Sequence, residues 1–204
     1  LWVAILASIY PDVPEQMYYL LELLKGVLNT AFYEHSKMII QILFYSVLSG
    51  REKLLSMYGA DLITMLLKII DEVSTSVAVE TMPVMHAIVL FLLQHQQPIL
   101  QSLVDHLIVR LFACDDSHLC YHYLLICCRI IVLNEAFFWS LFQNKVDAFG
   151  HFVTMLIRVP LDQLSANECR LLGTAAMKVL QFCERSSVFH DYHRPLANVM
   201  DTGL

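Results

Sequence analysis

The chain has 204 residues, of which 57% are hydrophobic and only 16% charged, and its formal net charge is −6 at pH 7. The length suffices for one ordinary domain, and so small a charged fraction suits a segment whose ends are covered by neighbouring repeats. The acidic balance and the scattered basic residues argue against a nucleic-acid surface, which would need a basic stripe.

The first six residues are apolar and include no initiator methionine. We interpret them as the interior of a helix, in a segment cut from a longer protein. A signal peptide is the rival interpretation, but these residues lack a basic n-region. Tyr10 and Pro11 predict the end of this helix, because proline cannot continue it. Asp12 and Glu15 then predict the start of the next helix.

Three helix pairs with one common plan follow, each with apolar residues three or four apart on one helix face. Written as helix, turn and helix, they are residues 17–28, 29–34 and 35–48; 62–70, 71–76 and 77–93; and 100–114, 115–117 and 118–133. The turns start at Asn29, Asp71 and Asp115, which are 42 and 44 residues apart. A repeat of this length is typical of HEAT and armadillo arrays.

The third pair shows the pattern most clearly. Asp115, Asp116 and Ser117 form its turn, and their short side chains favour an N-cap for the second helix. The apolar stripe consists of Leu100, Leu103, Leu107 and Leu111 on the first helix and Leu119, Tyr123, Ile126, Ile130 and Leu133 on the second.

The segments around these pairs carry local signals. Residues 51–58 predict a short helical link, and residues 59–61 predict the opening of the second pair. Pro83 predicts either a helix that begins near Thr81 or a kinked helix. Gly26 lies within a predicted helix, where we expect close packing of the partner helix to explain it.

The C-terminal third contains an aromatic helix and a fourth pair. The aromatic helix, at residues 134–143, has rings that form either an exposed anchor for a partner or, as we expect, a buried contact with the next repeat: Phe137, Phe138, Trp139 and Phe142. The fourth pair spans residues 146–157 and 167–184, and Ser165 and Glu168 predict a capping box for its last helix. From residue 188 the chain reads as a tail or as the start of a further element.

These elements predict an all-α fold. We expect an α-solenoid of antiparallel helix pairs, HEAT or armadillo-like, with about four repeats and partial end helices. Residues 1–204 then form one segment, of which the last 15 or so are a tail or a partial repeat.

Few residues suggest chemistry. His118 and His122 have the spacing of zinc ligands, with Cys114 and Cys120 nearby, but the general-base glutamate of a metalloprotease is absent and we interpret all four as ordinary core or surface residues. The six cysteines lie among apolar residues without a disulfide pattern, which favours a reducing, intracellular location.

A second polar group, in the last segment, is His190, Asp191 and His193. It could be a ligand cluster or an acid–base pair, but a solvated tail is the better interpretation. The longest strongly apolar runs, residues 87–93 and 124–128, are too short to span a bilayer.

Motifs of enzymes are missing from the sequence. It contains no Gly-x-Ser-x-Gly motif and no glycine-rich phosphate loop, and the paired carboxylates fall in turns, where they cap helices. The nine methionines could form an adaptable groove, but their helical spacing favours core packing. We therefore predict no enzyme, no catalytic residue, no metal and no cofactor.

With enzymatic motifs missing, we expect the chain to function by binding another protein on its surface. The second helix of each pair usually lines the inner face of a solenoid. We expect the solvent-facing polar positions of residues 35–48, 77–93 and 118–133 to contact a protein partner, without assigning individual residues.

The segment LCYHYLLICCRIIVLNEAFFWSLF and the divergent helix pairs resemble the importin-β (karyopherin-β) superfamily of nuclear transport receptors. The resemblance implies a central or C-terminal part of a receptor that shuttles between nucleus and cytoplasm and binds a cargo or adaptor protein. Through the full-length protein it also implies binding to the GTPase Ran and to nucleoporins. The acidic inner-loop runs of several members are missing, which leaves room for one dedicated partner. The alternatives are a non-transport HEAT-repeat scaffold that docks one partner, and a helical enzyme domain.

Overall fold

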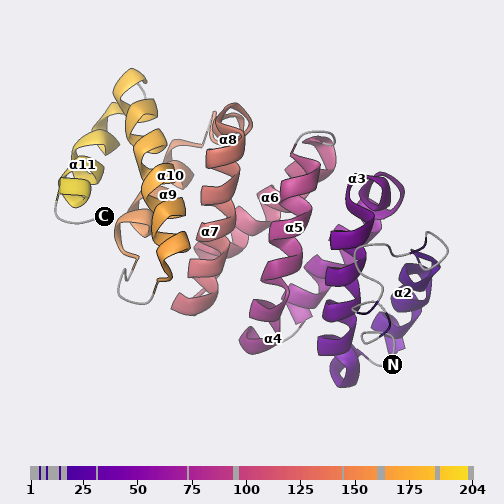
Figure 1. Ribbon diagram of the computed structural model, residues 1–204. Coiled ribbons are helices and arrows are strands. Elements are labelled where there is room, and N and C mark those ends of the chain that lie inside the picture. Colours follow the sequence, from indigo (N-terminus) through magenta and orange to yellow (C-terminus); the bar gives the residue numbers. More distant parts are fainter. Residues whose placement is uncertain are drawn as a thin grey trace. The chain divides into compact units, whose positions relative to one another are not determined.

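The computed structural model describes residues 5, 8, 14, 18–30, 32–72, 74–93, 97–143, 145–159, 164–186 and 189–201. Within these residues every regular element is a helix and none is a strand (Figure 1), as the helical periodicity predicts. The chain divides into two compact units, residues 1–106 and 107–204. The expectations for residues 1–6 and for the turn and cap at residues 10–15 fall largely outside the described residues.

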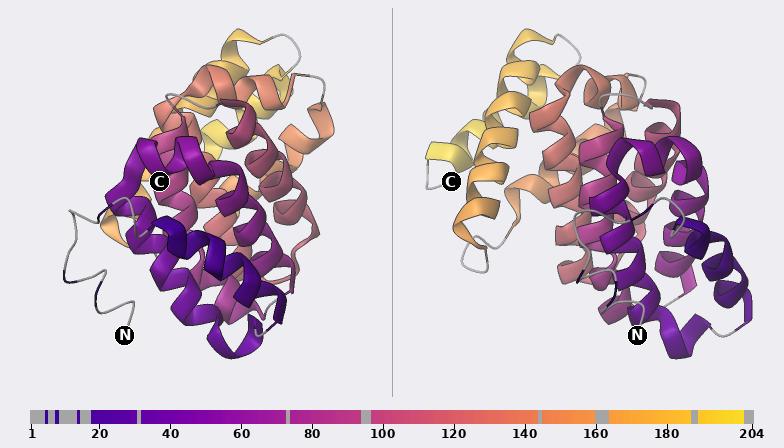
Figure 2. Two further views of the ribbon diagram at one scale, coloured as in Figure 1. Left: turned by 90° about the vertical axis from the view of Figure 1, so that its right-hand side faces the viewer. Right: turned by 45° about the vertical axis from the view of Figure 1, so that its right-hand side comes forward.

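Unit 1 is organised around one long helix. Its elements are α2 (Leu20–Thr30), α3 (Phe32–Glu72), α4 (Thr75–Glu80), α5 (Met82–Leu92) and the first part of α6 (Gln97–Ala113). The helices α2, α4 and α5 all pack against α3 (Figure 2). The α3 residues with no exposed surface are aliphatic: Ile39, Leu43, Val47, Leu54, Leu55, Leu62, Leu66 and Ile69. Burying each of them contributes about 1.5–3 kcal/mol.

The helix α3 bends at Arg51, whose φ of 44° and ψ of −135° are not helical. The two segments on either side run in different directions (Figure 1). Its first segment thus ends at residue 50, two residues beyond the end of the helix predicted at residues 35–48. Residues 51–58 are helical as predicted, but they are not a separate link, and residues 59–61 do not open a new helix, because the second segment continues through both to Glu72.

Other boundaries in unit 1 also differ from expectation. The predicted turn at residues 29–34 is much shorter, since α2 extends through Thr30 and α3 begins at Phe32. Pro83 lies in the first turn of α5, which is the first of the two alternatives. An added Cβ at Gly26 would have nothing within 4 Å, so close packing does not explain this glycine.

Unit 2 contains the remaining elements. After the end of α6 they are α7 (Ser117–Leu133), α8 (Glu135–Leu141), α9 (Val146–Ile157), α10 (Ala166–Arg185), the 3-10 helix η3 (His190–Tyr192) and α11 (His193–Asp201). The helix α7 packs against α8, α9 and α10. The predicted third pair and α9 are confirmed almost residue by residue. Of the predicted α7 stripe only Leu133 is misplaced, because it is 51% exposed.

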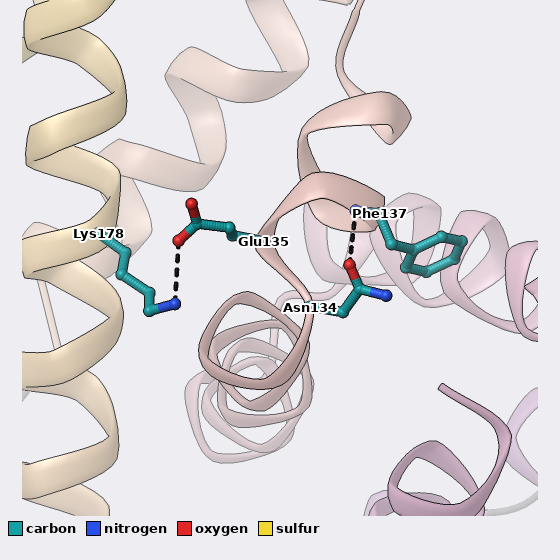
Figure 3. Close-up of polar contacts among 4 residues, drawn as sticks. All are labelled: Asn134, Glu135, Phe137 and Lys178. Carbon is teal, nitrogen blue, oxygen red and sulfur yellow. Dashed lines mark hydrogen bonds and ion pairs between the residues drawn. The ribbon is translucent and has the colours of Figure 1, made fainter. Parts of the chain in front are cut away.

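Side chains cap three of the helices in unit 2. Asp116 accepts a hydrogen bond from the Leu119 amide at 2.9 Å, and Asn134 accepts one from the Phe137 amide at 3.0 Å (Figure 3). Ser165 forms the predicted capping box with Glu168 on α10. Each cap satisfies amides that have no partner within the helix.

Aromatic rings fill the core of unit 2. Phe138, Phe142, Phe149 and Phe152 are at most 1% exposed, and Trp139 stacks on Phe182 with 3.9 Å between ring centroids. The interpretation of the aromatic helix as buried is therefore confirmed.

The last described residues are helical and packed. The helix α11 contacts α9 and α10, and its Leu196 is fully buried. A free tail is therefore the wrong alternative, and a further element begins here.

Candidate protein-binding surfaces

A groove lies between α3 and α5 in unit 1. Its volume is about 510 Å³, and its lining residues come from α3, from the end of α4 and from the start of α5: Lys37, Ile40, Gln41, Phe44, Glu80, Pro83 and Val84. These helices fall within the predicted second helices of the first two pairs. The groove therefore lies on helices that we expect, from the sequence, to contact a partner.

Polar groups form the rim of this groove. The Lys37 ammonium lies 2.7 Å from the Glu80 carboxylate and joins α3 to α4, with side chains 67% and 38% exposed. So exposed a pair contributes only about 0–1 kcal/mol to stability. Its charges therefore remain available to a partner, beside an apolar floor formed by Ile40, Phe44 and Val84.

A second cavity lies in unit 2, where the α6–α7 turn and α7 meet the end of α9. Its volume is about 320 Å³, and its lining residues are Cys114, Asp115, Ser117, Cys120, Tyr121, Leu124, His151, Thr154, Met155, Arg158 and Val159. The Asp116 cap fixes the start of α7 at its edge. His151 and Arg158 lie more than 30 residues from the α6–α7 turn, so no spacing rule in the sequence could have found this cavity.

Burial dominates the electrostatics of the cavity wall. Burial, followed by contact with the Cys114 thiol, raises the pKa of Cys120 to about 12. Burial, followed by the nearby Glu168 carboxylate, raises the pKa of Tyr121 well above its usual value. Both groups are therefore neutral at physiological pH, and the lining also contains an acidic residue, Asp115, and a basic one, Arg158.

The residues considered as zinc ligands do not form one cluster. The rings of His118 and His122 meet edge to face, with 4.8 Å between centroids, whereas the Cys120 thiol donates to the Cys114 carbonyl at 3.1 Å. Burial, followed by the neighbouring His118, lowers the pKa of His122. Among the described residues, no group of three or more His, Cys, Asp or Glu side chains could hold a metal ion.

The polar group near the C-terminus lies on η3 and at the start of α11. His190 and Asp191 are exposed, and His193 is half-buried. The two imidazole rings stack with 6.2 Å between centroids. The arrangement places the two rings beside each other at the surface of the described chain.

One stretch of the described chain, Thr75–Leu92, has the length and hydropathy of a membrane-spanning helix. Half of it is buried inside the structure, and it consists of α4 and α5, with the Glu80 carboxylate between apolar residues paired to Lys37. It is longer than the apolar runs noted in the sequence because it includes such polar residues. Packing of α5 against α3 accounts for its apolar character.

Comparison with known protein families shows to which family the chain belongs. A family model described as "Importin-11-like, TPR repeats" matches residues 1–159, more than three quarters of the chain. The chain belongs to this importin-11-like family. The resemblance to the importin-β superfamily and the repeat-solenoid class are thereby confirmed. Comparison with curated proteins and with solved structures found no match.

The importin-11-like match covers both surfaces. The groove of unit 1 and the cavity of unit 2 fall within residues 1–159, whereas α10 and α11 lie beyond them. Both surfaces therefore belong to the repeat region of the family and not to an added element.

Proposed function

We propose that this chain is a protein-binding segment of an importin-like nuclear transport receptor and holds a cargo or adaptor protein along the second helices of its repeats. The observation that carries the proposal is the groove of unit 1, which combines an apolar floor with a charged rim on two consecutive second helices. Membership of the importin-11-like family supports the transport role. The proposal assigns binding, and no catalysis, to the chain.

The groove suits a protein segment with one apolar side chain flanked by polar groups. The apolar side chain would pack on Phe44 and Pro83, which have accessible apolar surface above the buried Ile40 and Val84, and burial there would supply most of the binding energy, as in other interfaces. The Gln41 amide both donates and accepts, so it can pair with the peptide backbone of the partner. Lys37 and Glu80 would then favour a partner whose charged groups flank this apolar side chain and pair with the opposite charges of the rim.

The full-length protein would move between nucleus and cytoplasm and would bind Ran and nucleoporins through other parts of its array. The absence of acidic inner-loop runs favours one dedicated partner over a broad set of basic cargoes. It also keeps a non-transport scaffold as the second candidate. Pull-down with GTP-loaded Ran separates the two, because a scaffold would not bind it.

Crosslinking mass spectrometry on the full-length protein in cells tests the groove itself. We expect crosslinks from Lys37 to the partner. We expect Lys37→Glu to weaken the complex roughly tenfold, which corresponds to about 1.4 kcal/mol. The exposed Met57, on the other segment of α3, provides a control, and Met57→Glu should leave binding unchanged.

A charge swap distinguishes direct contact from folding. The double variant Lys37→Glu/Glu80→Lys restores an ion pair between α3 and α4 but inverts the rim. If the partner contacts these two charges directly, the double variant also binds the partner weakly. Full recovery of binding in the double variant would show that the partner does not contact these charges.

A further inference from the structure

The α6–α7 turn brings two thiols together at the wall of the unit 2 cavity. Cys114 follows the last residue of α6, and Cys120 lies in the first turn of α7. Both line the cavity of about 320 Å³, so a small molecule in that cavity meets both. Cys114 is half-buried, Cys120 is buried, and both are free thiols.

Hydrogen bonds hold these two residues close together. The Cys120 thiol donates to the Cys114 carbonyl oxygen at 3.1 Å. The Asp116 carbonyl accepts the Cys120 amide at 3.0 Å and lies 3.5 Å from the Cys114 sulfur. Because a carbonyl oxygen lies roughly 2.4 Å from its own Cα, the Cys120 sulfur lies within roughly 5.5 Å of the Cys114 Cα.

Such a separation is compatible with a disulfide. A disulfide needs sulfurs about 2.05 Å apart, and with the Cys120 sulfur within roughly 5.5 Å of the Cys114 Cα, rotation of the two side chains can bring the sulfurs to that distance. Cys114 stands outside regular helix, between α6 and α7, so its backbone and χ1 can adjust without breaking a helix. The other cysteines lack this combination. Cys127, Cys128 and Cys183 are buried and, like the half-buried Cys169, are not among the residues that line the cavity.

We propose that Cys114 and Cys120 form a reversible dithiol–disulfide site that a peroxide entering the cavity oxidises. The Cys114 sulfur, the more exposed of the two, attacks one peroxide oxygen; the O–O bond breaks, Cys114 becomes a sulfenic acid, and the leaving hydroxide takes the thiol proton to form water. The Cys120 sulfur then attacks the Cys114 sulfur. The S–O bond breaks, the S–S bond forms, and the released hydroxide leaves as a second water with the Cys120 proton.

The order of the two steps follows from the environment of each thiol. The buried Cys120, with a pKa of about 12, is a poor first nucleophile toward peroxide. It is well placed as the resolving thiol, because it needs only to reach its neighbour. Two electrons pass from the thiols to the peroxide, and an added dithiol reductant reverses the reaction by exchange.

Peptide mapping of the full chain after treatment with hydrogen peroxide tests the proposal. Trypsin would leave Cys114, Cys120, Cys127 and Cys128 in one peptide, since no lysine or arginine lies between Arg110 and Arg129. Cleavage before aspartate and after aromatic residues separates them. We expect the Cys114–Cys120 crosslink to exceed every other cysteine pair roughly tenfold, since oxidation follows exposure and proximity.

Two comparisons make the result decisive. Cys169→Ser should retain the crosslink, whereas Cys120→Ser should abolish it and leave Cys114 as a sulfinic acid or a mixed disulfide. The same oxidation in denaturant should lose the preference for this pair. Equal preference in denaturant, or a folded wild-type chain that accumulates Cys114 sulfinic acid with Cys120 reduced, would overturn the proposal without relying on any variant.

Discussion

The two units use helices of similar kind but build their cores from different side chains. Unit 1 buries leucine, isoleucine and valine along α3, whereas unit 2 gathers phenylalanine rings around Phe149. Aliphatic side chains contribute mainly through the area they bury, while ring pairs add about 0.5–1.5 kcal/mol from their geometry. Unit 2 therefore depends on orientation as well as on volume.

The helix starts differ in the same way. In unit 1, Ser74 and Thr81 stand at the N-caps of α4 and α5 without a side-chain cap hydrogen bond. In unit 2, Asp116, Asn134 and Ser165 each cap a helix, whereas α9 and the short η3 begin without such a bond. Boundaries in unit 2 are thus specified by short local signals, and those in unit 1 by packing and backbone geometry.

The ring cluster provides the largest expected effect. Phe149 is fully buried and contacts the rings of Phe142, Phe152, Phe182 and Phe189. We expect Phe149→Ala to reduce the free energy of unfolding by about 3–5 kcal/mol. Urea denaturation measures this loss, and hydrogen exchange should place it in unit 2. Phe149→Leu tests the comparison, because a negligible loss there would mean that the rings act only as volume.

Aliphatic positions should behave alike in both units. Ile126→Ala and Leu107→Ala in unit 2 and Leu43→Ala in unit 1 each remove a side chain with no exposed surface, so we expect each to cost about 2–5 kcal/mol. Val109, 64% exposed on the same helix as Leu107, is the matched control. Its change to alanine should stay within about 0.5 kcal/mol. A similar value for Leu107→Ala would place the apolar stripe on the wrong face of α6.

Helix boundaries could be predicted from the sequence more accurately in unit 2 than in unit 1, because of this difference in capping. The Asp115–Ser117 turn and the Ser165–Glu168 capping box could be read directly, because caps act over three or four residues. The end of the first segment of α3 was predicted to within two residues, but its direct continuation as helix from Arg51 through Gly59 and Asp61 was not, because these two residues looked like a helix boundary. A contact distant in sequence, of Tyr18 with Gly50, lies at the bend that joins the two segments.

The candidate surfaces were predictable only at the level of helices. The periodicity identified the second helices, and so the ranges that contain Lys37 and Glu80. It could not pair these two residues, which are 43 positions apart and meet through the packing of α3, α4 and α5. The cavity of unit 2 combines a turn with the end of α9, and nothing local marks that combination.

Removing the caps tests the contrast between helix starts. Asp116→Ala and Asn134→Ala should each cost about 0.5–2 kcal/mol, because each leaves an amide of the first turn without its acceptor. Ser74→Ala in unit 1 should be close to neutral, since Ser74 makes no cap hydrogen bond. Thermal and urea denaturation of the three variants would decide, and equal losses in all three would contradict the contrast.

A substitution at the bend in α3 should stabilise the chain, in contrast to the losses expected when the caps are removed. Arg51 adopts a positive φ that favours glycine, so Arg51→Gly should relieve strain and stabilise the chain by up to about 1 kcal/mol. Gly50→Ala is the matched change on the other side of the bend. Its Cβ would lie 2.9 Å from the Tyr18 hydroxyl and against Leu54, so we expect a loss of about 1–3 kcal/mol. Stabilisation by both changes would mean that the bend is not held by these contacts.

The smallest effect concerns pH and the capping box of α10. The hydrogen bond from the Ser165 side chain holds the pKa of Glu168 below its usual value, with a further contribution from the nearby His122. Because this pKa is lowered on folding, Glu168 contributes stability above the unfolded value of 4.5, and that contribution is lost as the pH falls through the folded value. Urea denaturation between neutral and acidic pH should therefore show a steeper loss for the wild type than for Glu168→Gln. The exposed Glu184 lies on the same helix, and Glu184→Gln should keep the wild-type slope. If Glu168→Gln also keeps it, the capping box does not couple α10 to pH.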